Sequence, residues 1–263
     1  MKKVLILALA AFIVFGCTKK DATKAGVLKV GATPVPHAVL LGLVADELKA
    51  EGIDLIVVDF TDYVTPNIAL NEGQIDANFF QHLPYMESFN KERGLALTSA
   101  GGVHVEPLGV YSKKHSSLGS NLNGATIAIP NDPTNEGRAL LLLAANGYIT
   151  LDAKAGLEGT PRNIRSNPYN LKFSELEAAQ LPRSLEDVDF AIINGNYAME
   201  AKLNPLKDAL LLEGAESPYV NIIAVRAGME KDPKILALLE ALRSPKVKTF
   251  ILNTYNGGVV AVF

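Results

Sequence analysis

The sequence predicts an α/β protein in which two candidate lobes can be recognised. From Val27 onward, short apolar runs alternate with stretches of helical pattern, which is typical of α/β folds. The alternation occurs in both halves of the chain, and two long extended segments can join the halves. The 263 residues, of which 48% are hydrophobic, are enough for two compact lobes with their own cores or for one large domain.

The first half of the chain is predicted to hold three strand–helix pairs. Its strands are expected at Val27–Thr33, Asp54–Phe60 and Ile75–Phe80. Its helices are expected at Pro36–Lys49, Val64–Glu72 and Leu83–Arg93. Gly94 follows the last of these helices, and a glycine is the usual residue at such a stop.

The second half repeats this plan with fewer recognisable elements. Its strands are predicted at Ala125–Pro130 and Val188–Ile193. Its helices are predicted at Asn135–Ala145, Asn196–Lys202, Pro233–Leu242 and Pro245–Asn253.

Two extended segments, Leu95–Ser112 and Ser217–Val225, are candidates for the connections between lobes. If both cross, the C-terminal helices return to the first lobe, which is then residues 27–108 with 224–263, and the second lobe is residues 109–223. Two connections permit a hinge motion. Ligands of open α/β sheets bind beyond the carboxyl ends of the strands, so we look for site residues just after strands.

Residues 1–17 have the pattern of a secretory signal that ends at a lipid-attachment cysteine. Lys2 and Lys3 precede an apolar run of twelve residues, which is shorter than the about 20 residues of a spanning helix. Gly16 and Cys17 then resemble a bacterial lipobox, in which Cys17 is lipidated and becomes the first mature residue, with residues 18–26 as a tether. A plain secretory signal with an incidental cysteine is the alternative.

Composition and motifs argue against several classes of function. A net charge of −3 without a Lys/Arg run disfavours nucleic acid as a partner. The sequence contains no G-x-S-x-G, Walker A, H-E-x-x-H or C-x-x-C motif. Its four histidines are scattered and lack metal-ligand spacing. We therefore expect a protein that is not an enzyme and that uses neither a cofactor nor a metal.

Arg138 is the sharpest single candidate for ligand binding. It is expected in the first turn of the helix that opens at Asn135, after Thr134, a residue suited to the N-cap. A cation there opposes the helix dipole, so the position is favourable if an anion binds to Arg138 and to free backbone N–H groups. The guanidinium matches a carboxylate with two hydrogen bonds. The alternative is a surface arginine paired with Glu136 or Asp132.

Aromatic residues gather near the ends of the second and third predicted strands: Tyr63, Phe79, Phe80 and His82. Because alternate residues of a strand share a face, Phe80 and His82 are expected to point one way and Phe79 the other way, into a core. An apolar slot lined by such rings suits a thioether. The plainer alternative places both phenylalanines in the core and His82 at the surface.

Three asparagines follow or lie within later strands. Asn194 and Asn196 come after the strand predicted at 188–193, and Asn221 lies in a β-rich apolar run where its amide needs a partner. An amide supplies both a donor and an acceptor, which suits the two charged groups of a zwitterion. For Asn194, which precedes Gly195, turn formation is an equally good explanation.

Four longer motifs occur in order along the chain. They are NFFQHLPY at Asn78–Tyr85, PNDPTNEGRALLLL at Pro130–Leu143, INGNYA at Ile193–Ala198 and ESPYVNIIAVR at Glu216–Arg226. These motifs resemble those of the NlpA/MetQ family, the methionine-binding lipoproteins of bacterial ABC importers. The likeness runs from the lipobox to the C-terminal NGGVVAVF and so covers essentially the whole mature chain.

The resemblance implies a type II periplasmic-binding-protein fold, in which two α/β lobes joined by two crossover segments close over an amino acid. By matching motifs, Arg138 would bind the carboxylate of L-methionine. Asn196 and Asn221 would bind its polar end, with Asn194 as the alternative to Asn196. The residues implied for the thioether pocket are Tyr63, Phe80 and His82.

The resemblance also implies partners and a location. The partners would be the permease and ATPase subunits of an ABC importer, with a membrane reached through the lipid on Cys17 at its extracytoplasmic, periplasmic face, and the protein would be a monomer. Relatives with other ligands leave D-methionine and methionine-containing dipeptides as alternatives. A surface lipoprotein that engages another protein is a further alternative.

Overall fold

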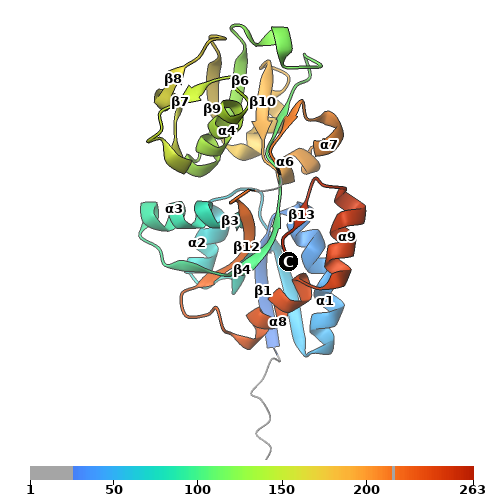
Figure 1. Cartoon of the computed structure of the whole chain (residues 1–263). Helices are drawn as coiled ribbons and strands as arrows, with labels where there is room; N and C mark the ends of the chain where they lie inside the picture. Colours follow the sequence, from blue (N-terminus) through green and yellow to red (C-terminus); the bar gives the residue numbers. More distant parts are fainter. Residues whose placement is uncertain (1–25, 215–216) are drawn as a thin grey trace, which may run out of the picture.

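Two β-sheets organise the chain, one in the lower and one in the upper half of the molecule (Figure 1). This computed structural model describes residues 26–214 and 217–263. The predicted signal peptide, Cys17 and all but the last residue of the predicted tether lie outside the described residues. Within the described ranges, no helix has the length and apolar character needed to cross a membrane.

The first sheet has six strands in the order β13-β4-β12-β3-β1-β2. Its strands are β1 (Gly26–Ala32), β2 (Ile53–Asp59), β3 (Ala77–His82), β4 (Leu97–Val105), β12 (Val220–Arg226) and β13 (Val260–Ala261). β1 runs parallel to β2 and β3, whereas β12 runs antiparallel to β3 and β4. A strand from the C-terminal part of the chain therefore lies between two strands from the N-terminal part.

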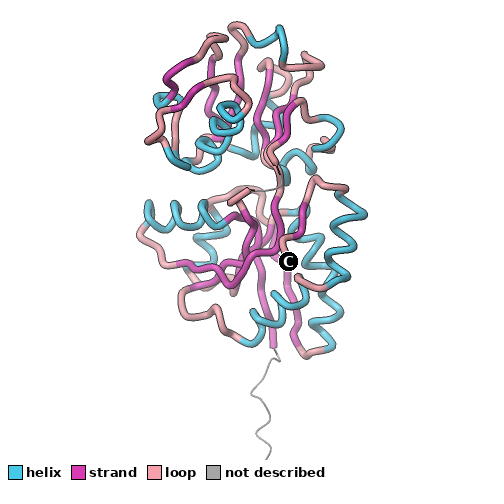
Figure 2. Tube along the Cα trace, in the orientation of Figure 1, coloured by secondary structure: helices cyan, strands magenta, loops and turns pink. Residues whose placement is uncertain are grey.

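Helices cover both faces of this sheet (Figure 2). One face carries the turn η1 (Pro34–Ala38) and the helices α1 (Val39–Ala50), α8 (Pro233–Leu242) and α9 (Pro245–Tyr255), and the other carries α2 (Thr65–Asn71) and α3 (Leu83–Arg93). β12 shows why both faces need cover. Ile223 and Val225 pack with α1 and α8, and the alternate residues Ile222 and Ala224 pack with α2 and α3.

The second sheet has five strands in the order β11-β5-β10-β6-β9. Its strands are β5 (Gly109–Tyr111), β6 (Thr126–Pro130), β9 (Lys172–Leu176), β10 (Phe190–Ile193) and β11 (Leu211–Leu212). β6 runs parallel to β9 and β10, and β5 runs antiparallel to β10 and β11. Phe190 and Ile192 pack under α4 (Pro133–Ala145), and Ala191 and Ile193 pack on the opposite face.

The remaining elements of the second half are short. They are the helices α5 (Leu181–Ser184), α6 (Gly195–Glu200) and α7 (Pro205–Asp208), the hairpin strands β7 (Thr150–Leu151) and β8 (Ile164–Ser166), and the 3₁₀ turns η2 (Gly119–Leu122), η3 (Gly156–Glu158), η4 (Pro161–Asn163) and η5 (Ala178–Gln180). α5 and α6 cover the face of the second sheet opposite α4.

The chain passes between the two sheets twice. Residues 106–108 connect β4 to β5, and residues 213–219 connect β11 to β12. The first connection lies inside the predicted segment Leu95–Ser112, whereas the second begins before the predicted start at Ser217. β12 begins at Val220 and lies wholly in the first sheet. The lobe boundaries at 108/109 and 223/224 stay a prediction.

Two predicted helices occur with the predicted bounds. α3 spans Leu83–Arg93, and Gly94 ends it in the left-handed conformation with φ of 65°. α8 spans Pro233–Leu242 as predicted. The first predicted helix is instead divided, because a turn at Pro34–Ala38 precedes the regular helix that starts at Val39.

The predicted start of α4 is wrong. The N-cap is Asp132, whose carboxylate accepts a hydrogen bond from the backbone N–H of Asn135, and Pro133 is the first helical residue. Thr134 therefore lies inside the helix, and Arg138 belongs to its second turn. Because the field of a helix end fades within the first turn, the dipole argument for an anion beside Arg138 does not apply.

Candidate functional site

A cavity lies between the two halves of the molecule. Its walls are Tyr63, Phe80, Gln81, His82, Tyr85, Glu106, Asn135, Arg138, Asn194, Gly195, Asn196 and Asn221. All seven side chains that the sequence analysis selected for the ligand line this one cavity. They come from both halves. Five of them lie in or after the carboxyl ends of β2, β3 and β10, which is where ligands of α/β sheets bind: Tyr63, Phe80, His82, Asn194 and Asn196. Arg138 instead lies in α4, and Asn221 lies at the start of β12.

One end of the cavity is lined by rings. Tyr63 lies 5.8 Å from Phe80, 5.9 Å from Tyr85 and 5.0 Å from Tyr197, measured between ring centroids. Phe80 faces this end, whereas Phe79 is buried in the core of the first half, as the alternation along the strand predicted. This end of the cavity can hold an apolar side chain.

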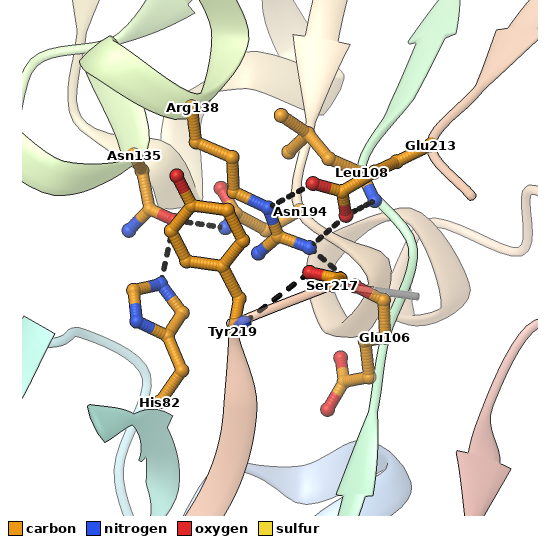
Figure 3. Close-up of polar contacts among 9 residues, drawn as sticks. All are labelled: His82, Glu106, Leu108, Asn135, Arg138, Asn194, Glu213, Ser217 and Tyr219. Carbon is orange, nitrogen blue, oxygen red and sulfur yellow. Dashed lines mark hydrogen bonds and ion pairs between the residues drawn. The ribbon is translucent and has the colours of Figure 1, made fainter. Parts of the chain in front are cut away.

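His82 is buried as a neutral imidazole that bonds across the cleft. Its Nδ1 accepts a hydrogen bond from the backbone N–H of Tyr85 at 3.1 Å, so the proton lies on Nε2, which donates to the side-chain oxygen of Asn135 at 3.1 Å (Figure 3). Burial, reinforced by the positive charge of Arg138, lowers the pKa of His82 to about 3. His82 is therefore a ring wall and a fixed donor rather than a charged group.

In the side-chain amide of Asn194 and in that of Asn196, one polar atom is hydrogen-bonded and the other has no partner among the described residues. The Tyr63 hydroxyl donates to Oδ1 of Asn196 at 2.5 Å, and Nδ2 of Asn194 donates to Oδ1 of Asn135 at 2.9 Å. Nδ2 of Asn196 and Oδ1 of Asn194 are buried without a hydrogen-bond partner within residues 26–214 and 217–263. The cavity wall therefore offers one free amide donor and one free amide acceptor.

Asn221 is oriented by a chain of hydrogen bonds. The Thr33 hydroxyl donates to Nδ1 of His37 at 2.7 Å, and Nε2 of His37 then donates to Oδ1 of Asn221 at 3.1 Å. Burial lowers the pKa of His37 to about 4, so its imidazole is neutral at neutral pH. This arrangement leaves Nδ2 of Asn221 as the donor that can meet a ligand.

Arg138 is buried, and its partner is Glu213. Nε of Arg138 donates to Oε1 of Glu213 at 3.0 Å, and one terminal nitrogen, NH2, pairs with Oε2 of the same carboxylate (Figure 3). NH2 also donates to the backbone oxygen of Glu106 at 2.8 Å. The guanidinium lies over the ring of Tyr219, 4.3 Å from its centroid. The alternative of a surface arginine paired with Glu136 or Asp132 is therefore wrong.

Glu106 is a buried carboxylate at the first connection. Its Oε1 lies 2.8 Å from Nε2 of His104 and 3.2 Å from Nε2 of His37, and its carboxylate also accepts from the backbone N–H of Asn196. Burial raises its pKa. The potential ligand atoms of these three side chains lie within 4.8 Å of one another, a spacing compatible with a metal ion. Their separations are those of N–H···O hydrogen bonds, which account for the cluster without an ion.

Sequence reasoning missed five residues of the cavity wall: Gln81, Tyr85, Glu106, Asn135 and Gly195. Asn135 and Tyr85 lie inside motifs that were selected as a whole, so attention to the neighbours of Arg138 and His82 could have found them. Glu106, and Glu213 behind Arg138, lie in the connections and carry no local pattern that marks them.

Comparisons with known proteins give a family and a fold. A family model described as NlpA lipoprotein matches residues 28–263. The chain is 45% identical over 211 residues to the D-methionine-binding lipoprotein MetQ of Escherichia coli, with 80% of this chain and 78% of that protein covered.

Two solved structures are similar over about nine-tenths of the chain. One is a nutrient-binding protein of Burkholderia cenocepacia bound to methionine, with a TM-score of 0.87, 49% identity and coverage of 90% of this chain and 100% of that one. The other is the periplasmic substrate-binding protein of an ABC transporter from Coxiella burnetii, with a TM-score of 0.85, 44% identity and coverage of 89% and 100%. These likenesses confirm the predicted two-lobed periplasmic-binding-protein fold.

Proposed function

Because this chain belongs to the NlpA lipoprotein family, we propose that it captures L-methionine outside the cytoplasm and delivers it to an ABC importer. The family comprises membrane-associated lipoproteins that bind substrates for transport. The cavity is the observation that carries the proposal, because it joins a ring-lined end to an end with a guanidinium and free amide groups.

The polar end has groups of both kinds that a zwitterion needs. We assign the carboxylate to Arg138, with Nδ2 of Asn196 and Nδ2 of Asn221 as neutral donors. We assign the ammonium to Oδ1 of Asn194, the buried acceptor that has no partner within the described ranges. Each of these amides is already held by another side chain, so little side-chain entropy is lost when the ligand binds.

The thioether is assigned to the ring-lined end. Tyr63, Phe80 and His82 present ring edges and faces there, and contacts between sulfur and an aromatic ring contribute ~0.3–1.5 kcal/mol each. The neutral state of His82 keeps this end free of charge, which favours an apolar side chain over a cationic one. D-methionine is the second candidate, because a relative at 45% identity is named for that ligand.

The anchor and the partners follow from the same proposal. Cys17 would carry the lipid and hold a monomeric receptor at the periplasmic face of a membrane. The permease and ATPase subunits of the importer would receive the amino acid, which the receptor releases chemically unchanged and without a cofactor.

Analysis of the copurified ligand tests this function. Protein purified under mild conditions is unfolded, and the released small molecules are identified by mass spectrometry with chiral separation. Stripped, refolded protein is then titrated with L-methionine, D-methionine, glycyl-methionine and alanine. We expect stoichiometric L-methionine and the tightest binding for it. If D-methionine or the dipeptide binds more tightly, that compound is the ligand in place of L-methionine. If none of the four compounds binds, a role in protein–protein interaction is the better explanation.

A further inference from the structure

We infer that Glu213 is a positioning residue for ligand binding, which holds the Arg138 guanidinium so that only one of its edges meets the ligand carboxylate; this inference rests on the proposed function. Glu213 lies just after β11, at the start of the second connection, and 75 residues from Arg138 in the sequence. It is not part of the cavity wall, whereas Arg138 is. Glu213 would therefore act through Arg138 and not by contact with the ligand.

The hydrogen bonds of Arg138 divide its guanidinium into two sides. A guanidinium has five N–H donors. Glu213 accepts from Nε and from NH2, and the backbone oxygen of Glu106 accepts from NH2 as well, which accounts for three donors. In the described part of the chain, no group accepts from the other terminal nitrogen, NH1. The two N–H groups of NH1 are thus the ones left for a carboxylate in the cavity.

The carboxylate of Glu213 is itself fixed from the other side. Its Oε2 accepts a hydrogen bond from the backbone N–H of Leu108 at 3.3 Å, which ties it to the first connection (Figure 3). Tyr219, whose ring lies against the guanidinium, belongs to the second connection. Arg138 is therefore held by residues of both segments that join the lobes, which fixes the guanidinium relative to both connections.

Burial makes this pairing more than a surface contact. The Arg138 side chain is 4% exposed and that of Glu213 is 16% exposed. A buried guanidinium without a partner carries a large desolvation cost, and it relieves that cost by moving toward other acceptors or water. With Glu213 in place, Arg138 is already charge-paired and oriented before the ligand carboxylate arrives. Glu213 does not compete with the ligand, because it binds Nε and NH2 of Arg138 and leaves NH1 free for the ligand carboxylate.

A double-mutant cycle tests this role. The variants are Glu213→Gln, Glu213→Asp, Arg138→Ala and Arg138→Ala/Glu213→Gln, with Glu186→Gln as the matched control, because Glu186 pairs with Lys113 in an exposed ion pair of the same half. Each stripped, refolded protein is titrated with L-methionine and with methioninol, which lacks the carboxylate. Thermal unfolding of each variant is recorded in parallel.

We expect Glu213→Gln to weaken L-methionine binding roughly 10-fold to 100-fold, as for the loss of one charge-assisted hydrogen bond, and to change methioninol binding little. Glu213→Asp keeps the charge and should restore part of the affinity. In the Arg138→Ala background, Glu213→Gln should have no further effect, whereas a merely structural role would add its effect there too. Glu186→Gln should bind as the parent does.

Other outcomes overturn the inference. Parent-like affinity of Glu213→Gln, or additive effects in the cycle, would show that Glu213 does not act through Arg138, and tighter binding would show that it competes with the ligand. If Glu213→Gln does not fold, Glu213→Asp in both backgrounds answers the same question. Arg138→Ala with parent-like methionine affinity would instead remove the proposed carboxylate site itself.

Discussion

The hydroxyl of Tyr63 donates a hydrogen bond to Oδ1 of Asn196, across the cleft between the two halves of the molecule, at 2.5 Å. Tyr63 follows β2 of the first sheet, and Asn196 lies in α6 beside the second sheet. One contact thus joins the lobes and turns Nδ2 of Asn196 toward the cavity. A second contact of the same kind runs from the Tyr197 hydroxyl to the backbone oxygen of Thr61 at 3.1 Å.

Tyr63→Phe should weaken methionine binding while it keeps the ring that lines the cavity. The variant removes the donor that orients Asn196 and one bond between the lobes, and a neutral hydrogen bond contributes about 0.5–1.5 kcal/mol, or roughly 2-fold to 12-fold in affinity. Calorimetric titration of stripped protein measures the change. Tyr148→Phe, a half-buried tyrosine remote from the cavity, is the control, and an equal effect in both variants would contradict the orienting role.

Arg138→Ala should weaken methionine binding by about 2–5 kcal/mol, or roughly 30-fold to several thousand-fold. The reason is that the variant removes the cation that is assigned to the carboxylate of the ligand. The fold should also lose stability, since the Glu213 carboxylate, which is only 16% exposed, is left without its cation. Wild-type protein should bind methioninol poorly, and the variant should lose little further. Arg165→Ala, which breaks an exposed pair with Asp152, is the control. Equal wild-type affinity for methionine and methioninol would refute the carboxylate assignment.

Phe80→Leu should reduce the preference for methionine over alanine. The variant keeps an apolar side chain but removes a ring from the thioether end, at a cost of ~0.3–1.5 kcal/mol for methionine and almost nothing for alanine. Competition between the two amino acids measures the ratio directly. A uniform loss for both ligands would mean that Phe80 supports the cavity without contacting the side chain of the ligand.

The protein should lose stability as the pH falls from 6.5 toward 4. Burial lowers the pKa of His37 to about 4 and the pKa values of His82 and His104 to about 3, whereas the unfolded imidazoles titrate near 6.5. Below pH 6.5 the unfolded state therefore binds more protons, and the loss is roughly 3 kcal/mol for His37 alone by pH 4. Glu106, whose pKa is raised, acts in the opposite direction.

Denaturant unfolding at pH 7.5, 6 and 5 checks this slope in the parent and in His104→Gln. The His104 side chain is fully buried. The pH dependence should be smaller in His104→Gln than in the parent. A stability that is flat from pH 7.5 to 5 in the parent would contradict neutral buried histidines.

Cys17→Ser should release the protein from membranes or leave its signal uncleaved. Cys17 ends a short apolar run, and a lipid on this residue is the proposed anchor. Partition between detergent and aqueous phases measures attachment. Partition of Cys17→Ser into detergent like the parent would rule out the lipid at this residue.

The periodicity of apolar residues determined the α/β class and several of its elements. α3 and α8 have the predicted bounds, because their amphipathic pattern and flanking residues are local signals. The opposite directions of Phe79 and Phe80 follow from the period of a strand, which no tertiary contact can change. The motif around Arg138 likewise marked the cavity before its geometry was known.

The interaction partner of Arg138 was decided by the tertiary structure alone. Arg138 was expected to face solvent or a ligand, yet its pair with Glu213 spans 75 residues. No local sequence pattern identifies the partner of a charged residue when the two residues are so far apart in the chain. Packing of the two connections around the guanidinium brings Glu213 there, and burial then makes the pairing obligatory.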